Sequence, residues 1–372
     1  MPTQSMFTYH AYGLESFALE YIECPAPAQN LPDWGLWVWP EDNPSKIPRI
    51  TPALTFDQQH KDLISSVRWA NSGKYFAFGS FGIVQLFEAE SMSLLKEFSC
   101  GLEASTPSTV GSFIRTIDFH PSGSFLAAGS ENKVIYILQF DSNVPLQVIT
   151  HHPQDIYCIK YSPSGEQLAS VSGDSHVAIW DVHVEERKHI LLKEISILRE
   201  SDSEYSKDCI ISFVCWSKDG KFIFVTSLGS SLYVINVELG TVSIHSSGHS
   251  ASIYHLSLSS DGKKLASASL DKTIRIWLIS CDENDQLILS SCLSILEGHQ
   301  DYVLSVTFSS DSRYIISSSK DTSIIIWCAF SYTLLCKIAS YKNSVLCIDS
   351  HPKLPLLLVG SGDCRMSIWN YK

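Results

Sequence analysis

Short runs of β-branched and aromatic residues alternate with polar turns along most of the chain. Tyr157–Tyr161 and Val303–Phe308 are two such runs, and their composition is typical of buried strands. The segments between runs contain Pro-Ser-Gly, Lys-Asp-Gly or Ser-Asp-Gly, which favour tight turns. The pattern therefore predicts an all-β fold built from many short strands.

The pattern repeats. In the clearest copies an apolar run ends in Trp, and an Asp stands six residues before that Trp. Weaker copies replace the Trp with another apolar residue. The equivalent positions are Phe87, Leu138, Trp180, Ile235, Trp277, Trp327 and Trp369. Three of the intervals are 42 residues and three are longer because of polar insertions. Seven copies with this period resemble the WD-repeat pattern, in which each copy forms a four-stranded blade. We expect a seven-bladed β-propeller over residues 50–372.

The last copy needs an outer strand from elsewhere in the chain. It ends at Trp369, three residues before the end of the sequence, and a propeller must not leave a sheet edge open. The run Ile50–Phe56 is the candidate closing strand.

Residues 1–49 form a separate region, predicted to be an N-terminal arm. They hold seven of the 15 prolines, and three tryptophans stand between Leu31 and Pro40. Proline at this density excludes a long helix. An extended arm that packs its tryptophans on the propeller and a partner-binding arm both remain open.

Three copies carry a complete set of His, Asp and Trp at matching positions. The sets are His152, Asp174 and Trp180; His249, Asp271 and Trp277; and His299, Asp321 and Trp327. In a propeller these side chains and a serine on the second strand can form one buried hydrogen-bonded network. Such a network stabilises a fold only when every polar group in it has a partner. We therefore predict a structural role for all nine residues.

Composition and charge disfavour nucleic-acid binding, membrane insertion and secretion. The 27 Lys and Arg against 39 Asp and Glu give a net charge of −12, which disfavours direct binding of nucleic acid. No apolar run is long enough to predict a membrane span, and no secretory signal is recognisable at the N-terminus. The 11 scattered cysteines fit a reducing compartment. These features fit a protein of the cytoplasm or the nucleus.

Catalytic and metal-binding patterns are incomplete. Gly248–Ser252 resembles a nucleophile elbow, but Ser252 replaces the last glycine. The adjacent His151 and His152 suggest a metal pair, yet His152 already belongs to a predicted network. The sequence contains no P-loop and no dinucleotide-binding glycine motif. We therefore expect no enzyme activity, no cofactor and no metal.

Recognition of another protein remains as the predicted function. One set of side chains stands five residues after each network His or its equivalent, and a second set precedes each turn Asp. The first set is Arg115, Tyr157, Tyr254, Leu304 and Leu346, and the second is Glu131, Gly173, Leu270, Lys320 and Gly362. Asn343 stands in the loop that enters the last copy. Aromatic and apolar side chains around one opening are typical of binding hot spots.

The sequence from about Asp57 to Lys372 resembles the WD-repeat domain of Tup-type general transcriptional corepressors (Tup/Groucho-like). The matching stretches include Phe113–Gly123, Gly298–Ser305 and Gly360–Arg365, followed by Ile368–Lys372. The resemblance implies a nuclear corepressor without DNA-binding ability. It also implies sequence-specific repressors, histone tails and a tetratricopeptide-repeat corepressor as partners.

In that family, repressors dock on one face of the propeller. Carried over by position, this role falls on Glu131, Tyr157, Tyr254, Leu304, Lys320 and Asn343. Family members also carry a helical tetramerisation segment before the propeller, whereas the residues before the first copy here are rich in proline. The alternative is a WD-repeat scaffold subunit of another nuclear or cytoplasmic complex, in splicing, general transcription or ubiquitin ligation.

Overall fold

The computed structural model describes residues 8–9, 17–18, 36–38, 48, 50–56, 62–101, 112–183, 186, 188–197, 210–246, 248–281 and 287–372. These residues form strands and turns, and no helix able to cross a membrane occurs among them. The chain divides into two compact units, Met1–Asp33 and Trp34–Lys372. In the first unit, β1 (Thr8–Tyr9) pairs antiparallel with β2 (Phe17–Ala18).

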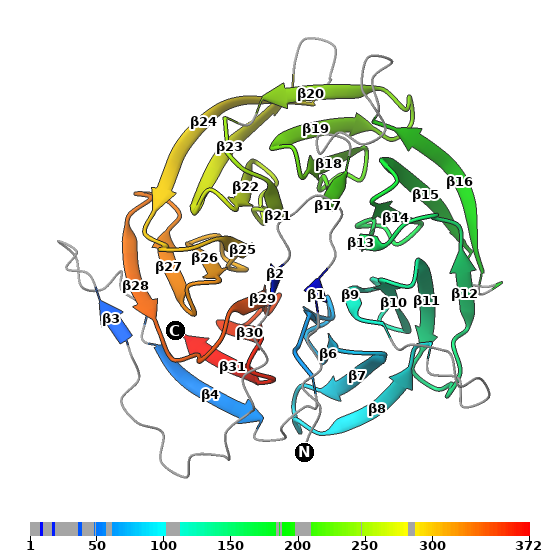
Figure 1. The fold of residues 1–372 in the computed structure, drawn as a ribbon, viewed down its shortest axis with the longest axis horizontal. Helices are drawn as coiled ribbons and strands as arrows, with labels where there is room; N and C mark the ends of the chain where they lie inside the picture. Colours follow the sequence, from blue (N-terminus) through cyan, green and yellow to red (C-terminus); the bar gives the residue numbers. More distant parts are fainter. Residues whose placement is uncertain are drawn as a thin grey trace. The chain divides into compact units, whose positions relative to one another are not determined.

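The second unit is a seven-bladed β-propeller, as predicted, and its blades are antiparallel sheets arranged around one axis (Figure 1). The strands of each blade are given in order from the innermost, at the axis, to the outermost. Blade 1 holds β5 (Ser66–Trp69), β6 (Tyr75–Gly79), β7 (Ile83–Glu88) and β8 (Leu94–Ser99). Blade 2 holds β9 (Ile114–Phe119), β10 (Phe125–Ser130), β11 (Val134–Gln139) and β12 (Gln147–Thr150). Blade 3 holds β13 (Ile156–Tyr161), β14 (Gln167–Ser172), β15 (His176–His183) and β16 (Lys188–Ser196). Blade 4 holds β17 (Ile211–Trp216), β18 (Phe222–Ser227), β19 (Ser231–Asn236) and β20 (Val242–Ser246).

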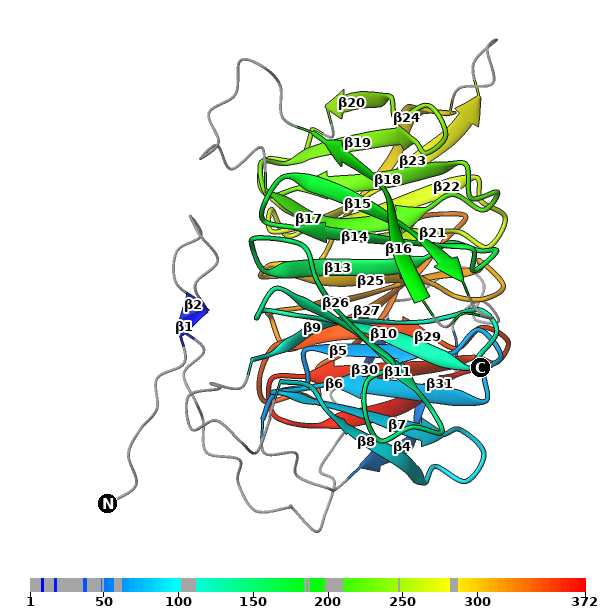
Figure 2. The ribbon, with the colours of Figure 1, turned by 90° about the vertical axis from the view of Figure 1, so that its right-hand side faces the viewer.

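The remaining three blades repeat this order. Blade 5 holds β21 (Ile253–Leu258), β22 (Lys264–Ser269), β23 (Thr273–Cys281) and β24 (Leu287–Glu297). Blade 6 holds β25 (Val303–Phe308), β26 (Tyr314–Ser319), β27 (Ile324–Cys328) and β28 (Leu334–Ile338). Blade 7 holds β29 (Val345–Ser350), β30 (Leu356–Ser361), β31 (Met366–Tyr371) and β4 (Ile50–Phe56). Figure 2 shows the same strands from the side.

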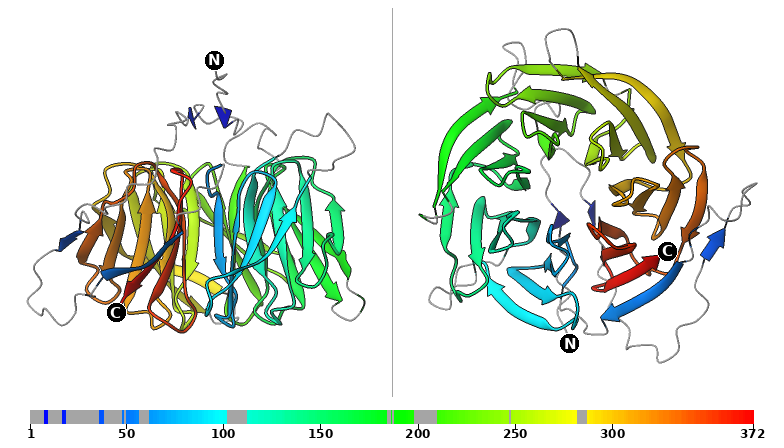
Figure 3. Two further views of the ribbon diagram at one scale, coloured as in Figure 1. Left: turned by 90° about the horizontal axis from the view of Figure 1, so that it is seen from below. Right: turned by 180° about the vertical axis from the view of Figure 1, so that it is seen from behind.

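Strand β4 confirms the predicted closing strand. It pairs antiparallel with β31, and the register runs from Met366 opposite Phe56 to Tyr371 opposite Ile50. Figure 3 shows β4 in blue lying along β31 in red. A strand that precedes blade 1 in the sequence thus completes the last blade, so the outer edge of β31 is paired.

A further strand from the same N-terminal region was not anticipated. β3 (Leu36–Val38) pairs antiparallel with β28, with Val38 opposite Cys336 and Leu36 opposite Ile338. It forms a fifth strand on blade 6. The predicted arm 1–49 therefore contributes backbone pairing to a blade. The predicted packing of its tryptophan side chains lies outside the described residues.

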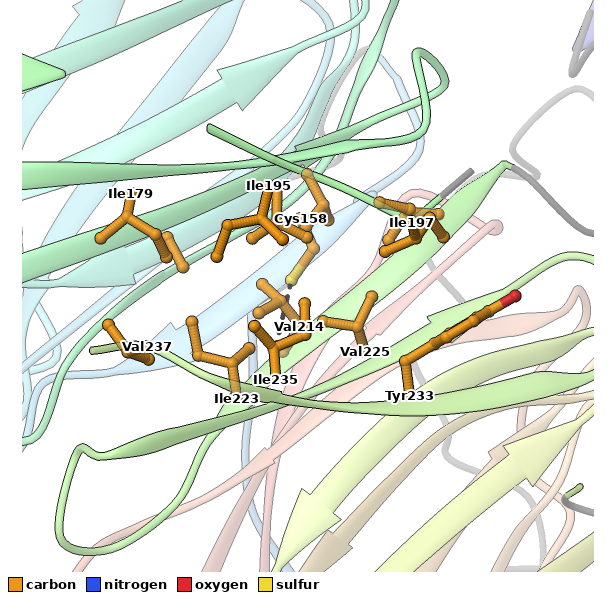
Figure 4. Packing of buried hydrophobic residues seen from close by; sticks show 14 of the residues in the cluster. Cys158, Ile179, Ile195, Ile197, Val214, Ile223, Val225, Tyr233, Ile235 and Val237 are labelled. Atoms are coloured by element: carbon orange, nitrogen blue, oxygen red, sulfur yellow. Dashed lines mark hydrogen bonds between the residues drawn. The ribbon is translucent and has the colours of Figure 1, made fainter. Parts of the chain in front are cut away.

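The core lies between neighbouring blades. Where blades 3 and 4 meet, Ile179 and Ile195 of blade 3 pack in one cluster with Val214 and Ile235 of blade 4 (Figure 4). All six residues of β18 are buried, because both faces of a blade interior are covered by its neighbours. This double burial explains the nearly continuous apolar runs seen in the sequence.

Polar side chains also join the innermost strands of adjacent blades. Asp118, the penultimate residue of β9, accepts a hydrogen bond from the backbone N–H of Tyr161 in the next blade at 2.9 Å. Asp349 occupies the same position in β29 and accepts from the N–H of Trp69 at 2.7 Å. The innermost strands have no further strand to pair with on the axis side. These two aspartates therefore supply acceptors for backbone N–H groups that would otherwise lack a hydrogen-bond partner.

Candidate functional site

The three predicted His, Asp and Trp sets are each joined by hydrogen bonds through a serine. In blade 3, His152 Nδ1 lies 2.6 Å from Asp174 Oδ2, and His152 Nε2 lies 2.8 Å from Ser170 Oγ. Trp180 Nε1 donates to the same Ser170 Oγ at 2.9 Å. An indole only donates and a carboxylate only accepts, so Nδ1 of the histidine carries the proton and the serine hydroxyl donates to Nε2. Every polar group of the set then has a partner.

Blades 5 and 6 repeat this geometry. His249 contacts Asp271 and Ser267, each at 2.8 Å, and Trp277 donates to Ser267 at 3.0 Å. The corresponding network in blade 6 consists of His299, Ser317, Asp321 and Trp327, with distances between 2.8 and 3.0 Å.

Electrostatics support the ionised state of the network carboxylates. Burial on its own would raise the pKa of Asp271, but hydrogen bonds from His249 and Thr273 bring it well below its ordinary value. The pKa of Asp321 is lowered in the same manner by His299 and Ser323. Burial lowers the pKa of His299 below its usual range, although Asp321 acts in the opposite direction. The network carboxylates are therefore ionised at neutral pH, and in blade 6 the carboxylate of Asp321 faces a neutral imidazole of His299.

Blade 7 contains a related network that the sequence analysis missed. Trp369 Nε1 donates to the hydroxyl of Tyr341 at 2.7 Å, and that hydroxyl lies 2.6 Å from Ser367 Oγ. Tyr341 stands 22 residues before Asp363, the same interval that separates His152 from Asp174. This interval is visible in the sequence, but a tyrosine stands where the other networks have a histidine.

The first of the two predicted sets, the residues five positions after each network His or its equivalent, shares a structural feature. In six blades the pairing between the first two strands shifts by one residue, which leaves one innermost-strand residue bulged out of the ladder. The bulged residues are Arg115, Tyr157, Ser212, Tyr254, Leu304 and Leu346. A bulge redirects the side chain away from the sheet surface. All of them except Ser212 are half-buried.

These bulges all lie where the innermost strands begin, and we call this end of the propeller the top face. The turn Asp of each network lies at the same end, between the second and third strands. The network therefore fixes the turn that carries the preceding residue, such as Lys320 before Asp321. Two sets of predicted residues are thus placed on one face by neighbouring structural elements.

Blades 2 and 3 bring four charged or aromatic side chains together on the top face. Arg115 Nη2 lies 3.0 Å from Glu131 Oε1 and 3.7 Å from Asp155 Oδ2. Its guanidinium carbon lies 4.8 Å from the centre of the Tyr157 ring. Burial raises the pKa of both carboxyls, and Arg115 offsets this only in part.

Tyr157 carries the hydroxyl of this group. Burial raises the pKa of Tyr157 to about 12.

The other predicted top-face residues belong to blades 6 and 7. Lys320 Nζ lies 5.1 Å from the centre of the Tyr302 ring. Asn343 donates to the Gly362 carbonyl at 3.2 Å and accepts from the Ser344 N–H at 2.7 Å, so its amide is held by backbone on both sides. Leu304, two positions after Tyr302 in blade 6, is half-buried. The face combines aromatic, apolar and charged side chains, a composition suited to binding a protein.

No cluster of three or more His, Cys, Asp or Glu that could hold a metal ion occurs in the described part of the chain. His152, which the sequence placed beside His151 as a possible metal pair, has both ring nitrogens engaged in its network.

Comparison with known protein families gives a direct match. The model of the WD domain, G-beta repeat matches residues 105–138, 143–181, 240–277, 290–328 and 333–370, about half of the chain. This protein belongs to the WD-repeat family. The copies that end at Phe87 and Ile235 lie outside the matched WD segments, although the structure shows that both form blades.

Several curated proteins are similar to parts of this WD-repeat protein. Apoptotic protease-activating factor 1 of Danio rerio is 23% identical over 59% of this chain and 19% of its own length. The chromatin assembly factor 1 subunit FAS2 homolog of Oryza sativa is 28% identical over 44% of this chain and 33% of its own length. The histone acetyltransferase type B subunit 2 of Candida glabrata is 28% identical over 49% of this chain and 41% of its own length.

The chain thus spans less than half the length of each of these relatives. They include proteins named for chromatin assembly and histone acetylation, together with an apoptotic factor. The similarities establish the WD-repeat family and leave the resemblance to Tup-type corepressors as a prediction.

Proposed function

We propose that this protein is a non-enzymatic WD-repeat scaffold of a nuclear complex, and that it binds a partner protein through its top face. The observation that carries the proposal is the ring of bulged residues, of which Tyr157, Tyr254, Leu304 and Leu346 are aromatic or aliphatic. Large apolar side chains that a fold holds at one opening, instead of in its core, are typical of interaction sites.

The nuclear assignment is supported by the names of relatives. Besides the two chromatin-related proteins above, transcription initiation factor TFIID subunit 5 of Caenorhabditis elegans is 25% identical over 44% of this chain and 23% of its own length. The acidic net charge of −12 supports recruitment by other proteins in preference to direct contact with DNA.

More specifically, we propose a transcriptional corepressor. Its top face would capture sequence-specific repressors through Glu131, Tyr157, Tyr254, Leu304, Lys320 and Asn343. Histone tails and a tetratricopeptide-repeat corepressor are the further partners of this proposal. The alternative partner set is that of another nuclear or cytoplasmic WD-repeat complex.

The test is affinity purification of the full chain from its own cells, followed by mass spectrometry. We expect wild-type protein to recover chromatin or transcription proteins. Tyr254→Asp and Leu304→Asp should each reduce that recovery at least tenfold, because a buried carboxylate opposes apolar contact. The matched control is Leu354→Asp, which changes an exposed leucine in the turn between the first two strands of blade 7, at the opposite end of the propeller.

Two results would contradict the proposal. Undiminished recovery with both folded top-face variants would remove the top face as the binding site. Recovery of a splicing, ubiquitin-ligase or cytoplasmic assembly instead of repressors would replace the corepressor assignment with the alternative.

A further inference from the structure

A cavity of about 350 Å³ lies at the end of the propeller opposite the top face. Residues near the C-terminal ends of all seven innermost strands line it, and so do Asn71, Pro121 and Pro163 in the turns that follow three of them. The bulged residues lie at the other ends of the same strands. The cavity extends from this end as far as Phe213 and His255, which directly follow the bulged Ser212 and Tyr254, whereas its charged residues lie nearer the C-terminal ends of their strands.

Four charged side chains project into this cavity from four blades. Arg68 Nε donates to Asp118 Oδ1 at 2.8 Å, and Arg68 Nη1 donates to Asp349 Oδ1 at 3.1 Å. Lys160 Nζ also donates to Asp118 Oδ1, at 3.2 Å. Two cations and two carboxylates thus form one chain of ion pairs across blades 7, 1, 2 and 3.

The carboxylates of this chain are fully engaged. The second oxygen of Asp118 accepts the Tyr161 N–H, and the second oxygen of Asp349 accepts the Trp69 N–H. All four carboxylate oxygens therefore already accept a hydrogen bond from the protein.

The cations have donors to spare. A guanidinium carries five N–H donors and an ammonium three, whereas the described residues accept two from Arg68 and one from Lys160. The remaining donors have access to solvent, since the side chains of Arg68 and Lys160 are 32% and 13% exposed.

A second polar group on the cavity wall is also unsatisfied. His255 Nδ1 is buried and has no hydrogen-bond partner within the described residues. The ring packs against Phe213, with 4.1 Å between ring centres, and both residues line the cavity. Phe213 also lies 5.8 Å from Lys160 Nζ.

We propose that this cavity binds a small oxyanion, a phosphate or a carboxylate, between Arg68 and Lys160. Charge-assisted hydrogen bonds from these two side chains hold the oxygens. Aromatic side chains such as Phe213 and Trp216 form the wall beside them. The volume lies within the range of small-molecule sites, roughly 300–1,000 Å³. Partner binding at the top face is not required for this site.

Isothermal titration calorimetry of the full chain at constant ionic strength tests the proposal, with inorganic phosphate and benzoate as probes. We expect at least one probe to bind wild-type protein with a Kd below about 1 mM. Lys160→Met should weaken binding at least tenfold, and Lys160→Arg should restore it to within about threefold of wild type, because it returns the charge and donors. Tighter binding of phosphate assigns the phosphate class, and tighter binding of benzoate assigns the carboxylate class.

The control is Lys218→Met. Lys218 lies in the turn after β17 at the same end of the propeller, where its Nζ donates to the Ser260 carbonyl, and it does not line the cavity. The Lys218→Met variant should bind the probes with the same Kd as the wild-type protein. Equal losses in Lys160→Met and Lys218→Met would identify an adventitious ion only, and the proposal would be wrong. Absence of binding of both probes to wild-type protein would also overturn it. Thermal unfolding confirms that each variant is folded, and Lys160→Gln replaces Lys160→Met if the latter is not.

Discussion

At the residue scale, a single serine hydroxyl connects the histidine and tryptophan of each network. In β26, Ser317 Oγ lies 2.8 Å from His299 Nε2 and 2.9 Å from Trp327 Nε1. Its neighbour Ser318 is equally buried, but the Ser318 hydroxyl has no hydrogen-bond partner among the described residues. These two serines have the same burial on opposite faces of one strand, and only the hydroxyl of Ser317 has hydrogen-bond partners.

This pair allows a matched prediction on stability. Ser317→Ala leaves two buried polar groups without a partner, and each such group costs about 1–3 kcal/mol. We expect it to lower the free energy of unfolding by about 3 kcal/mol. Ser318→Ala removes only an unpartnered hydroxyl and should change the free energy by less than about 0.5 kcal/mol. Urea denaturation of both variants measures the difference, and equal effects would show that the network does not stabilise the fold.

Histidines outside the networks make stability depend on pH. His189 in β16 accepts or donates a hydrogen bond at Nε2, which lies 3.0 Å from the Tyr161 hydroxyl, whereas its buried Nδ1 has no partner in the described part. Burial, with smaller contributions from His120 and His183, lowers the pKa of His189 to about 4. The folded protein thus favours the neutral ring, and the unfolded chain binds the proton more readily between pH 6.5 and 4.

The sign of the effect follows. Stability from His189 is complete above pH 6.5 and is lost as the pH falls towards 4. At pH 5 the loss from this group is about 2 kcal/mol. We expect the difference in unfolding free energy between pH 7.5 and pH 5 to be smaller by about that amount in His189→Gln, measured by urea denaturation. An unchanged difference would mean that His189 is already protonated in the folded protein at pH 5, or that other groups cause the acid sensitivity.

At the scale of elements, periodicity predicts the strands well and their register poorly. Apolar runs and Gly-containing turns identify the blades, including those that end at Phe87 and Ile235 without a Trp. The bulge at Tyr157 arises because Ile156 pairs with Ser172 while Cys158 pairs with Val171. This one-residue change of register depends on how two strands pair. The alternation of apolar and polar residues along a single strand cannot reveal it. The constant distance from the network histidine nevertheless selected the bulged position.

Other elements could not be found because their partners are remote in the chain. β3 is three residues long and becomes a strand only by pairing with β28, some 300 positions away. The contact of Asp118 with Arg68 and Lys160 likewise depends on three strands converging at the axis. In the sequence, Asp118 is a single charged residue within an apolar run and indicates no interaction. In the folded propeller it contacts Arg68 and Lys160.

At the scale of the whole molecule, the propeller depends on closing the ring with a strand from the other end of the sequence. β4 supplies the outer strand of blade 7, and the blade 7 core clusters with both of its neighbours. Without β4 the outer edge of β31 would expose its backbone donors and acceptors. The Trp69–Asp349 hydrogen bond and the Arg68–Asp349 ion pair join blades 1 and 7 at the axis, but they do not replace the missing strand.

The length of the N-terminal region provides the test of this dependence. A chain that starts at residue 57 lacks β4, whereas one that starts at residue 48 lacks β3 but keeps β4. We expect the shorter chain to unfold at least about 10 °C below the full chain or to aggregate, and the longer one to stay within about 4 °C of it. A synthetic peptide of residues 48–56 added in trans should raise the unfolding temperature of the shorter chain, because the edge of β31 can still accept a strand. Differential scanning calorimetry measures all four unfolding temperatures. If the chain from residue 57 melts with the full chain, the axial contacts between blades 1 and 7 are sufficient to close the ring, and β4 only covers an edge.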